Sequence, residues 1–172
     1  MRESGAAILN VPTADRMRSV GEAVARALEG VGGTFVIALE GDLGAGKTTL
    51  VSGILRACGV TGPVRSPTYT LVEPYEAAGK RLYHLDLYRL VDPHEVEPLG
   101  IRDLLSEPAI LLVEWPSRAA GALPTPDLTV DIDYLASGVE GRRVTLRAHS
   151  PSGHNVVQRI VAAIPEMRLL SL

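Results

Sequence analysis

The chain has 172 residues, 46% of them hydrophobic and 22% charged, and a formal net charge of −3 at pH 7. These totals are typical of an ordinary globular protein, and they predict one domain over residues 1–172 that buries about 68–70% of its unfolded surface. They exclude a general electrostatic attraction to nucleic acid, and no apolar run is long enough to span a membrane. The first residues do not resemble a secretory signal, because Asn10 and Pro12 end the short apolar stretch, so we expect a cytoplasmic protein.

The first helix, the first buried strand and the second helix are predicted from hydrophobic spacing. Thr13 can cap a helix that reaches about Glu29, because apolar residues recur on one face and glycines follow. The β-branched and aromatic run Thr34–Glu40 predicts a strand, and helical spacing predicts a second helix over Thr48–Cys58. Cys58 is the single cysteine, so it cannot form an internal disulfide, and we expect a buried structural thiol.

A glycine-rich loop joins that strand to the second helix. Residues Gly41–Thr48 fit the pattern of two glycines separated by four residues and followed by lysine and a hydroxyl residue. Glycines allow successive backbone N–H groups to surround phosphate oxygens, and a helix that begins near Gly46 adds the positive end of its dipole. Lys47 brings a positive charge to the outer phosphates, and Thr48 brings a hydroxyl for Mg²⁺, which prefers oxygen ligands. This segment, the phosphate loop, predicts a nucleoside triphosphate site.

The middle of the chain predicts two further strands with a short helical region between them. Arg81–Tyr88 is expected to be a strand. Asp92 can cap a helical region that has Pro93 as its first residue and reaches Leu105. The uninterrupted apolar run Ala109–Val113 is typical of a strand in a parallel sheet with helices on both faces.

The last part of the chain predicts a hairpin and a closing helix. Leu128–Tyr134 and Arg143–Ala148 alternate apolar and polar residues around glycines, which predicts an antiparallel hairpin at the edge of the sheet. Asn155–Ile164 is expected to be a helix. A small basic group on the hairpin is interpreted as a solvated strand face: Arg142, Arg143 and Arg147. The whole pattern predicts an α/β fold like that of the P-loop NTPases, with a mainly parallel central sheet flanked by helices.

Two acidic residues are candidates for handling metal and water, because such acids lie where strands of a parallel sheet end. Glu114 follows the buried run and is either the metal-side acid or an ordinary acid facing water. The metal is favoured, because a carboxylate at the end of a buried strand needs a cation or hydrogen-bond donors. Asp86 either holds metal-bound water or orients the attacking water, or it forms an ion pair with Arg89. His84 is interpreted as a half-buried imidazole and not as a base.

Four segments occur together in an order and spacing that are specific to one family. They are Gly41–Thr49, Ser66–Thr70, His84–Arg89 and Glu114–Pro116, and Leu99–Ile101 adds to them. This set resembles the bacterial ATPase family TsaE, also called YjeE. The resemblance implies ATP and Mg²⁺ as cofactors, TsaB and TsaD proteins as partners, and a role in threonylcarbamoylation of adenosine 37 in tRNAs that read codons beginning with A. Whether the protein touches tRNA directly stays open.

The resemblance also implies roles for individual residues. Lys47, Asp86 and Glu114 would be catalytic, Thr48 and Glu114 would hold magnesium, and Ser66–Thr70 would form a mobile, switch-like segment. The residues implied in nucleotide binding are Leu43, Gly44, Ala45, Gly46, Lys47, Thr48, Thr49, Trp115 and Gly138. The first helix of the family usually has threonine where Met17 stands, which leaves the contacts of residues 13–17 with the base open.

Two other functions stay open. A small-molecule kinase can share the phosphate loop but usually carries an arginine-rich lid, and here the arginines are scattered along the chain at Arg56, Arg65, Arg81, Arg89 and Arg118. The non-enzymatic alternative is an assembly module in which ATP orders Ser66–Thr70 and the ordered segment binds a partner. Since no arginine finger is identified, we expect a slow ATPase that a partner activates.

Overall fold

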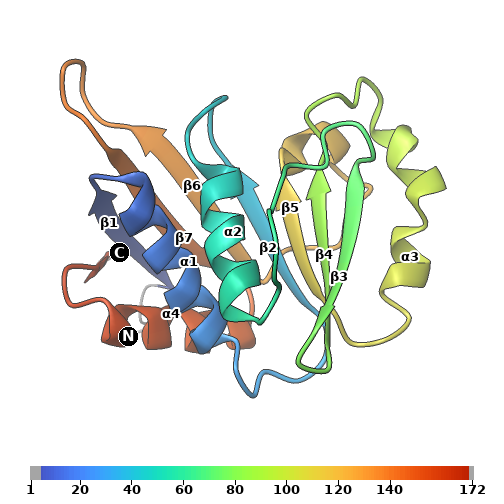
Figure 1. Cartoon of the computed structure of the whole chain (residues 1–172), viewed down its shortest axis with the longest axis horizontal. Coiled ribbons are helices and arrows are strands. Elements are labelled where there is room, and N and C mark those ends of the chain that lie inside the picture. Colours follow the sequence, from blue (N-terminus) through green and yellow to red (C-terminus); the bar gives the residue numbers. More distant parts are fainter. Residues whose placement is uncertain (1–4, 171–172) are drawn as a thin grey trace.

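An eight-stranded mixed sheet runs through the computed structural model of the chain, which describes residues 5–170 (Figure 1). The strand order is β3-β4-β5-β2-β6-β7-β1-β8. The centre is parallel, since β2 pairs with β5 and β6, and β5 pairs with β4. The other neighbours are antiparallel. The strands are β1 (Ala6–Val11), β2 (Phe35–Glu40), β3 (Val72–Ala77), β4 (Lys80–Asp86), β5 (Ile110–Glu114), β6 (Leu128–Tyr134), β7 (Arg142–Ala148) and β8 (Arg168–Leu169). The predicted α/β class is confirmed.

The four predicted helical regions are present with shifted ends. The helices are α1 (Ala14–Ala27), α2 (Lys47–Ala57), the 3₁₀ helix η1 (Pro93–Leu99), α3 (Ile101–Leu104), the 3₁₀ helix η2 (Pro116–Ala119) and α4 (Pro151–Ala163), and the short helix η2 was not predicted. The side chain of Thr13 caps α1 as predicted, accepting from the amide of Arg16 at 3.1 Å. The closing helix starts earlier than expected, because the hydroxyl of Ser150 accepts from the amide of Gly153 at 3.0 Å and caps it.

The hairpin predicted over residues 128–148 forms, but its place in the sheet differs from the prediction. It consists of β6 and β7, and both strands lie inside the sheet, because β6 also pairs with β2 and β7 also pairs with β1. The antiparallel hairpin at an edge is instead β3–β4. Neither β1 nor β3 was predicted. Strand β3 contains Pro74, which an edge strand tolerates because one side of its backbone has no partner strand.

Apolar layers cover both faces of the central strands. Ile110 and Leu112 belong to the core formed with α1, α2 and α4, whereas Leu111 and Val113 belong to the core beneath η1, α3 and η2. The prediction that residues 109–113 form a strand covered on both faces is therefore confirmed. Figure 1 shows α1 and α2 side by side in front of the sheet. No helix within residues 5–170 has the length and apolar character needed to cross a membrane.

Two glycines allow α1 and α2 to pack closely behind the phosphate loop. A Cβ atom on Gly21 would lie 2.3 Å from the carbonyl oxygen of Leu50, and one on Gly53 would lie 2.2 Å from that of Arg18. Any side chain at these positions would push the helices apart. The single cysteine, Cys58, is buried at the end of α2 as expected, and burial raises the pKa of its thiol.

Candidate functional site

The candidate site lies at the edge of the sheet where three neighbouring parallel strands end. The phosphate loop follows β2, Asp86 is the last residue of β4, and Glu114 is the last residue of β5. Asp86 and Glu114 are register partners on adjacent strands. Both side chains are buried, with 4% and 3% of their surface exposed. The fold thus brings together the two acids and the loop in the crevice where α/β proteins bind ligands.

The phosphate loop leaves the start of α2 open. Gly46, at the N-cap of α2, has φ +117° and carries no side chain that could bond the first amides of the helix. The first N–H groups of a helix have no partner within it, and they favour an anion. The Lys47 ammonium group donates to the loop carbonyls of Gly41 and, at 3.1 Å, of Asp42. An anion in this loop would offer the ammonium group a charged partner in place of these neutral ones.

Trp115 lies beside Lys47. Its ring centroid is 4.0 Å from the Lys47 Nζ atom and 5.0 Å from the ring of Tyr88. Trp115 has φ +58°, a left-handed conformation that is uncommon for a residue with a side chain. Such conformations persist where the surrounding structure enforces them, and they cluster at functional sites. Here the turn directs the chain from the end of β5 into η2.

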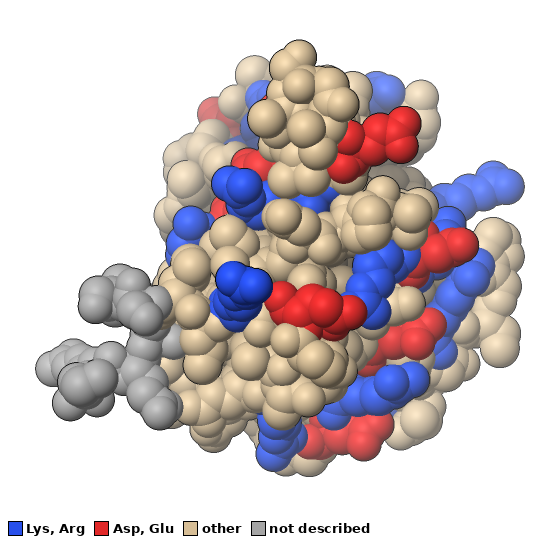
Figure 2. All heavy atoms as spheres, turned by 90° about the vertical axis from the view of Figure 1, so that its left-hand side faces the viewer, with Lys and Arg blue, Asp and Glu red and all other residues tan. Residues whose placement is uncertain are grey.

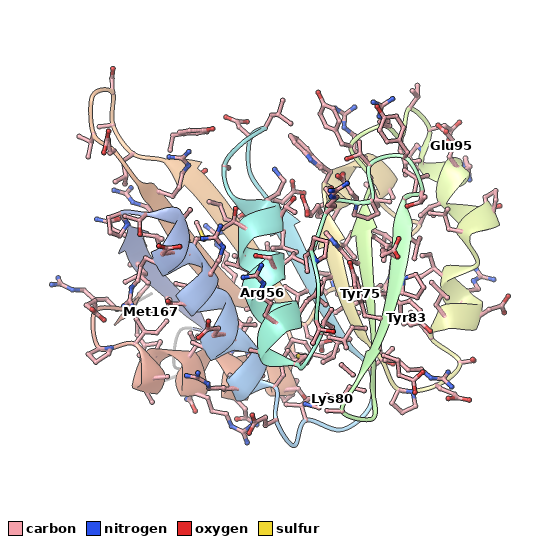
Figure 3. The ribbon with its side chains drawn as sticks, in the orientation of Figure 1. Arg56, Tyr75, Lys80, Tyr83, Glu95 and Met167 are labelled. Atoms are coloured by element: carbon pink, nitrogen blue, oxygen red, sulfur yellow. The ribbon has the colours of Figure 1, made fainter. Side chains whose placement is uncertain are left out.

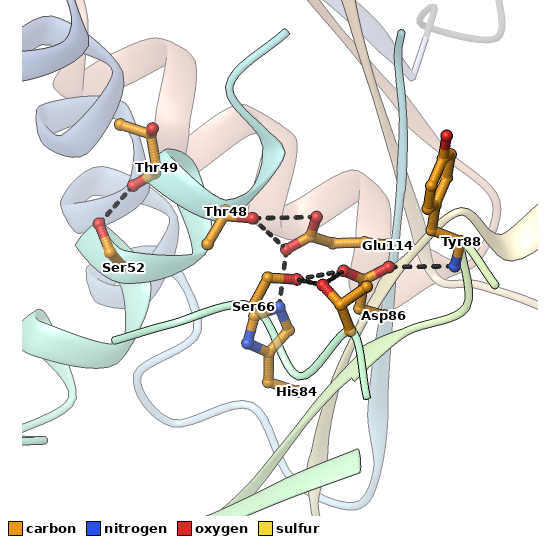
Figure 4. A network of polar contacts seen from close by, with 9 residues as sticks. Thr48, Thr49, Ser52, Ser66, His84, Asp86, Tyr88 and Glu114 are labelled. Atoms are coloured by element: carbon orange, nitrogen blue, oxygen red, sulfur yellow. Dashed lines mark hydrogen bonds and ion pairs between the residues drawn. The ribbon is translucent and has the colours of Figure 1, made fainter. Parts of the chain in front are cut away.

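Glu114 accepts hydrogen bonds from two directions (Figure 4). The Thr48 hydroxyl lies 2.9 Å from Oε1 and 3.1 Å from Oε2, and the His84 Nε2 atom lies 2.7 Å from Oε1. Glu114 is therefore not an acid facing water, and His84 is fully buried, where a half-buried ring was predicted. A hydroxyl and a carboxylate next to one another are the oxygen ligands that Mg²⁺ prefers alongside phosphates, so Thr48 and Glu114 fit this ion.

Asp86 is held by the segment that the resemblance implies to be switch-like. The Ser66 and Thr68 hydroxyls donate to Oδ2, the latter at 3.1 Å, and the amide of Tyr88 donates to Oδ1 at 3.0 Å (Figure 4). Among residues 5–170 Asp86 forms no ion pair with Arg89, the alternative that the sequence left open. The guanidinium of Arg89 instead lies 4.2 Å from the ring of Tyr69.

Burial lowers the pKa of Lys47. Loss of hydration disfavours the ammonium form, and the nearby carboxylates of Glu114, Asp86, Glu40 and Asp42 oppose this effect without cancelling it. The ammonium group is thus less favoured than in water. A phosphate bound beside it would restore the preference for the charged form.

The β6–β7 hairpin holds the phosphate loop from the other side. The Tyr134 hydroxyl donates to the carbonyl of Leu43 at 3.0 Å. Arg142 donates from Nε to the carbonyl of Ala45 at 3.1 Å and from Nη2 to that of Gly44 at 3.3 Å, and its guanidinium lies 4.0 Å from the Tyr134 ring. The interpretation of Arg142 as a solvated arginine was wrong. Register makes Tyr134 and Arg142 opposite residues, which the sequence alone did not specify.

Replacing Arg142 by alanine is expected to weaken nucleotide binding about tenfold, because the loop loses two charge-assisted hydrogen bonds that fix its conformation. Isothermal titration calorimetry with ATP and magnesium measures this affinity. Arg143→Ala is the matched control, since it removes the same charge from the neighbouring exposed position. Equal affinities for wild type and Arg142→Ala would contradict a role in holding the loop.

A pocket of about 150 Å³ lies between the phosphate loop, the start of α1 and the hairpin. It is lined by Val11, Pro12, Thr13, Ala14, Met17, Gly44, Ala45, Gly46, Thr49, Gly141 and Arg142. Met17 lies against the loop, since its Cε atom is 3.3 Å from the point where a Cβ atom on Gly46 would lie. The hairpin lines this pocket through Gly141 and Arg142, whereas Gly138, which was predicted to approach the nucleotide, is not among the lining residues.

Charged residues of both signs lie on the surface away from the candidate site. Figure 2 shows Lys and Arg interspersed with Asp and Glu on the face that it views. Figure 3 shows Arg56 on α2 and Lys80 at the end of β4 opposite to Asp86. Arg81 pairs with Glu107 at 2.7 Å.

Comparison with known proteins identifies one family. The model of the family "Threonylcarbamoyl adenosine biosynthesis protein TsaE" matches residues 11–144. A "tRNA threonylcarbamoyladenosine biosynthesis protein TsaE" of Haemophilus influenzae is 49% identical over 123 residues, which are 72% of this chain and 76% of that protein. The protein of that name in Bacillus subtilis is 39% identical over 113 residues, 66% and 69% of the two chains. The crystal structure of YdiB from Bacillus subtilis has a similar fold, with a TM-score of 0.74 and 24% identity over 92% of this chain and 95% of that one.

Proposed function

The chain belongs to the TsaE family of tRNA threonylcarbamoyladenosine biosynthesis proteins, and from this premise we propose that it is a magnesium-dependent ATPase that acts with TsaB and TsaD in the cytoplasm. One observation carries the proposal. The Thr48 hydroxyl of the phosphate loop lies 2.9 Å from the buried carboxylate of Glu114 on a neighbouring strand. We further propose that residues 1–172 form a single ATPase domain.

The phosphate loop would bind the triphosphate through residues 43–49. The open amides at the start of α2 would surround phosphate oxygens, and Lys47 would exchange its loop carbonyls for the outer phosphates. A magnesium ion held by Thr48 and Glu114 would offset charge that develops on the outer phosphates. Trp115, 4.0 Å from the Lys47 ammonium, would close the site on the side of β5.

Asp86 would orient the attacking water. Asp86 is the last residue of the strand beside that of Glu114, and the hydroxyls of Ser66 and Thr68 donate hydrogen bonds to its Oδ2 atom. Water must therefore compete with these hydroxyls, or the Ser66–Thr70 segment must move before Asp86 can act. This arrangement favours slow hydrolysis by the isolated protein, and it couples Asp86 to the segment that the resemblance implies to be mobile.

The pocket beside α1 is the proposed location of the nucleoside. It adjoins the phosphate loop through Gly44, Gly46 and Thr49, and its other walls include residues 11–14. Met17 contributes an apolar wall where the family usually has threonine, so the base would rest against a thioether there. A contact of Gly138 with the nucleotide stays a prediction, and it would require the tip of the hairpin to approach the pocket.

The same site also supports a second role, that of a nucleotide-dependent assembly switch. Tyr69 lies in the switch-like segment with 82% of its surface exposed, directly beside the hydroxyls that hold Asp86. A change at Asp86 would therefore reach an exposed aromatic side chain, the kind that anchors protein interfaces. ATP-dependent complex formation by Asp86→Ala, with hydrolysis lost, would separate assembly from turnover. A small-molecule kinase, by contrast, would consume ATP only together with an acceptor.

The pKa of Lys47 leads to a prediction for nucleotide affinity. Binding favours the ammonium form, so affinity should be constant at neutral pH and fall as pH rises through the pKa of Lys47 in the free protein. Because burial lowers that pKa, the fall should begin below the ordinary value of 10.5. Titration calorimetry above about pH 8, where phosphates of pKa about 6 stay fully ionised, measures the midpoint. Lys47→Arg keeps its charge over this range, so its nucleotide affinity should change less with pH. Identical pH profiles for wild type and Lys47→Arg would contradict the assignment of the titration to Lys47.

A turnover assay tests the proposed activity. Phosphate release from ATP, without any acceptor, should require magnesium and should be slow for the isolated protein. Release that is the same with and without magnesium would contradict the proposed site, and transfer of phosphate to a metabolite in equal amount would favour the kinase.

A further inference from the structure

Within residues 5–170, His84 is the one histidine that lies in the core of the sheet. It sits on β4 two residues before Asp86, and none of its surface is exposed. Its Nε2 atom is 2.7 Å from Oε1 of Glu114. Its Nδ1 atom has no hydrogen-bond partner within the part of the chain that the structure describes. A buried polar ring with one bond and one unpartnered nitrogen calls for a functional explanation.

The two ring nitrogens have different surroundings. A proton on Nδ1 would bury an N–H group without an acceptor, and an unprotonated Nε2 would direct its lone pair at a carboxylate oxygen. Both arrangements are unfavourable. The geometry therefore favours the neutral tautomer with its proton on Nε2, where it donates to Glu114.

We propose that His84 is a positioning residue that holds the Glu114 carboxylate toward Thr48 for magnesium binding. The inference rests on the proposed function of this site. Oε1 of Glu114 accepts from both His84 and Thr48, while Oε2 accepts from Thr48 alone. If Thr48 held a metal ion, the bond from His84 would still orient the carboxylate. Hydrogen bonds of this kind to a metal ligand are worth about 10–100-fold in metal affinity or activity.

A neutral donor suits this role better than a cation would. A buried carboxylate needs donors to offset lost hydration. Lysine or arginine at position 84 would supply them but would also neutralise the charge that attracts magnesium. The neutral imidazole supplies a donor and leaves the negative charge of Glu114 available to the ion.

Three variants test the proposal. His84→Leu removes the hydrogen-bond donor and fills its place in the core with an apolar side chain. His84→Gln retains an N–H donor of similar reach. His149→Leu is the control, since it removes a histidine that contacts the Thr129 hydroxyl at 2.8 Å, away from the site. Magnesium is titrated into each folded protein with a non-hydrolysable ATP analogue bound, and the fluorescence of the single tryptophan, Trp115, is recorded.

We expect His84→Leu to raise the magnesium concentration at half-saturation at least about tenfold, and His84→Gln to stay within about threefold of wild type. His149→Leu should match wild type, and the affinity for the analogue without magnesium should be the same in all four proteins. Wild-type magnesium affinity in His84→Leu would overturn the proposal, as would equal losses in the leucine and glutamine variants, because packing alone would then explain them.

A measurement on the wild-type protein needs no substitution at all. Nitrogen chemical shifts of the His84 ring should show a proton on Nε2 and none on Nδ1, and the reverse tautomer would overturn the proposal. A wild-type protein that shows no magnesium-dependent change in fluorescence would contradict the proposed function itself. If wild type responds and His84→Leu responds alike, only the inference about His84 is wrong.

Discussion

Replacing Glu114 by alanine should lower the rate of ATP hydrolysis at least about 100-fold, the loss typical when one group that stabilises transition-state charge is removed. Glu114 contacts the hydroxyl of Thr48 and is buried, so no water-exposed carboxylate can take its place readily. Phosphate release at saturating magnesium measures the loss. Glu114→Gln is the sharper variant, because it keeps the volume of the side chain and removes the charge.

The control for this experiment is Glu107→Gln, which removes the charge of an exposed glutamate that pairs with Arg81 at the other end of the sheet. It should hydrolyse ATP at the wild-type rate. Normal hydrolysis by Glu114→Ala would assign the metal-side carboxylate to Asp86, its register partner on β4.

Adding the TsaB–TsaD complex should raise ATP turnover at least about tenfold, and an arginine inserted by a partner is worth up to about 10³–10⁵. The structure gives two reasons to expect activation. Arg142 already donates to the carbonyls of the phosphate loop, so a second arginine would have to come from a partner. Asp86 is held by Ser66 and Thr68, so a partner that moves this segment would free it.

Turnover is measured with the isolated protein, with the complex alone and with both together. Lys47→Ala in the presence of the complex is the control, since any activity that survives belongs to the partners. Equal rates for the protein alone and with the complex would contradict activation.

The sequence predicted the location of those site residues that lie in a motif or directly follow a hydrophobic run. Gly41–Thr48 joins a buried strand to a helix, and Glu114 ends an apolar run, so local pattern alone brings both to one edge of a parallel sheet. Asp86 follows the same logic on β4. These locations follow from where each strand ends, and the residues next to each position in the sequence determine that end.

The rest of the site depends on contacts between distant segments. His84 meets Glu114 only because β4 and β5 pair in one register, and Arg142 reaches the phosphate loop only because β6 lies beside β2. Register is set by the packing of whole strands, and a shift by one residue would turn each side chain to the other face. Strand β3 escaped prediction for a related reason, since its polar residues and Pro74 suit an edge and resemble a loop.

Calorimetric titration of wild type and Lys47→Ala with ATP and magnesium tests most directly whether the start of α2 binds a triphosphate. Wild type should bind one nucleotide per chain, and Lys47→Ala should bind at least about tenfold more weakly, because the phosphate charge loses its partner. Absence of binding to wild type with both adenine and guanine triphosphates, or equal affinity in the two proteins, would contradict the account.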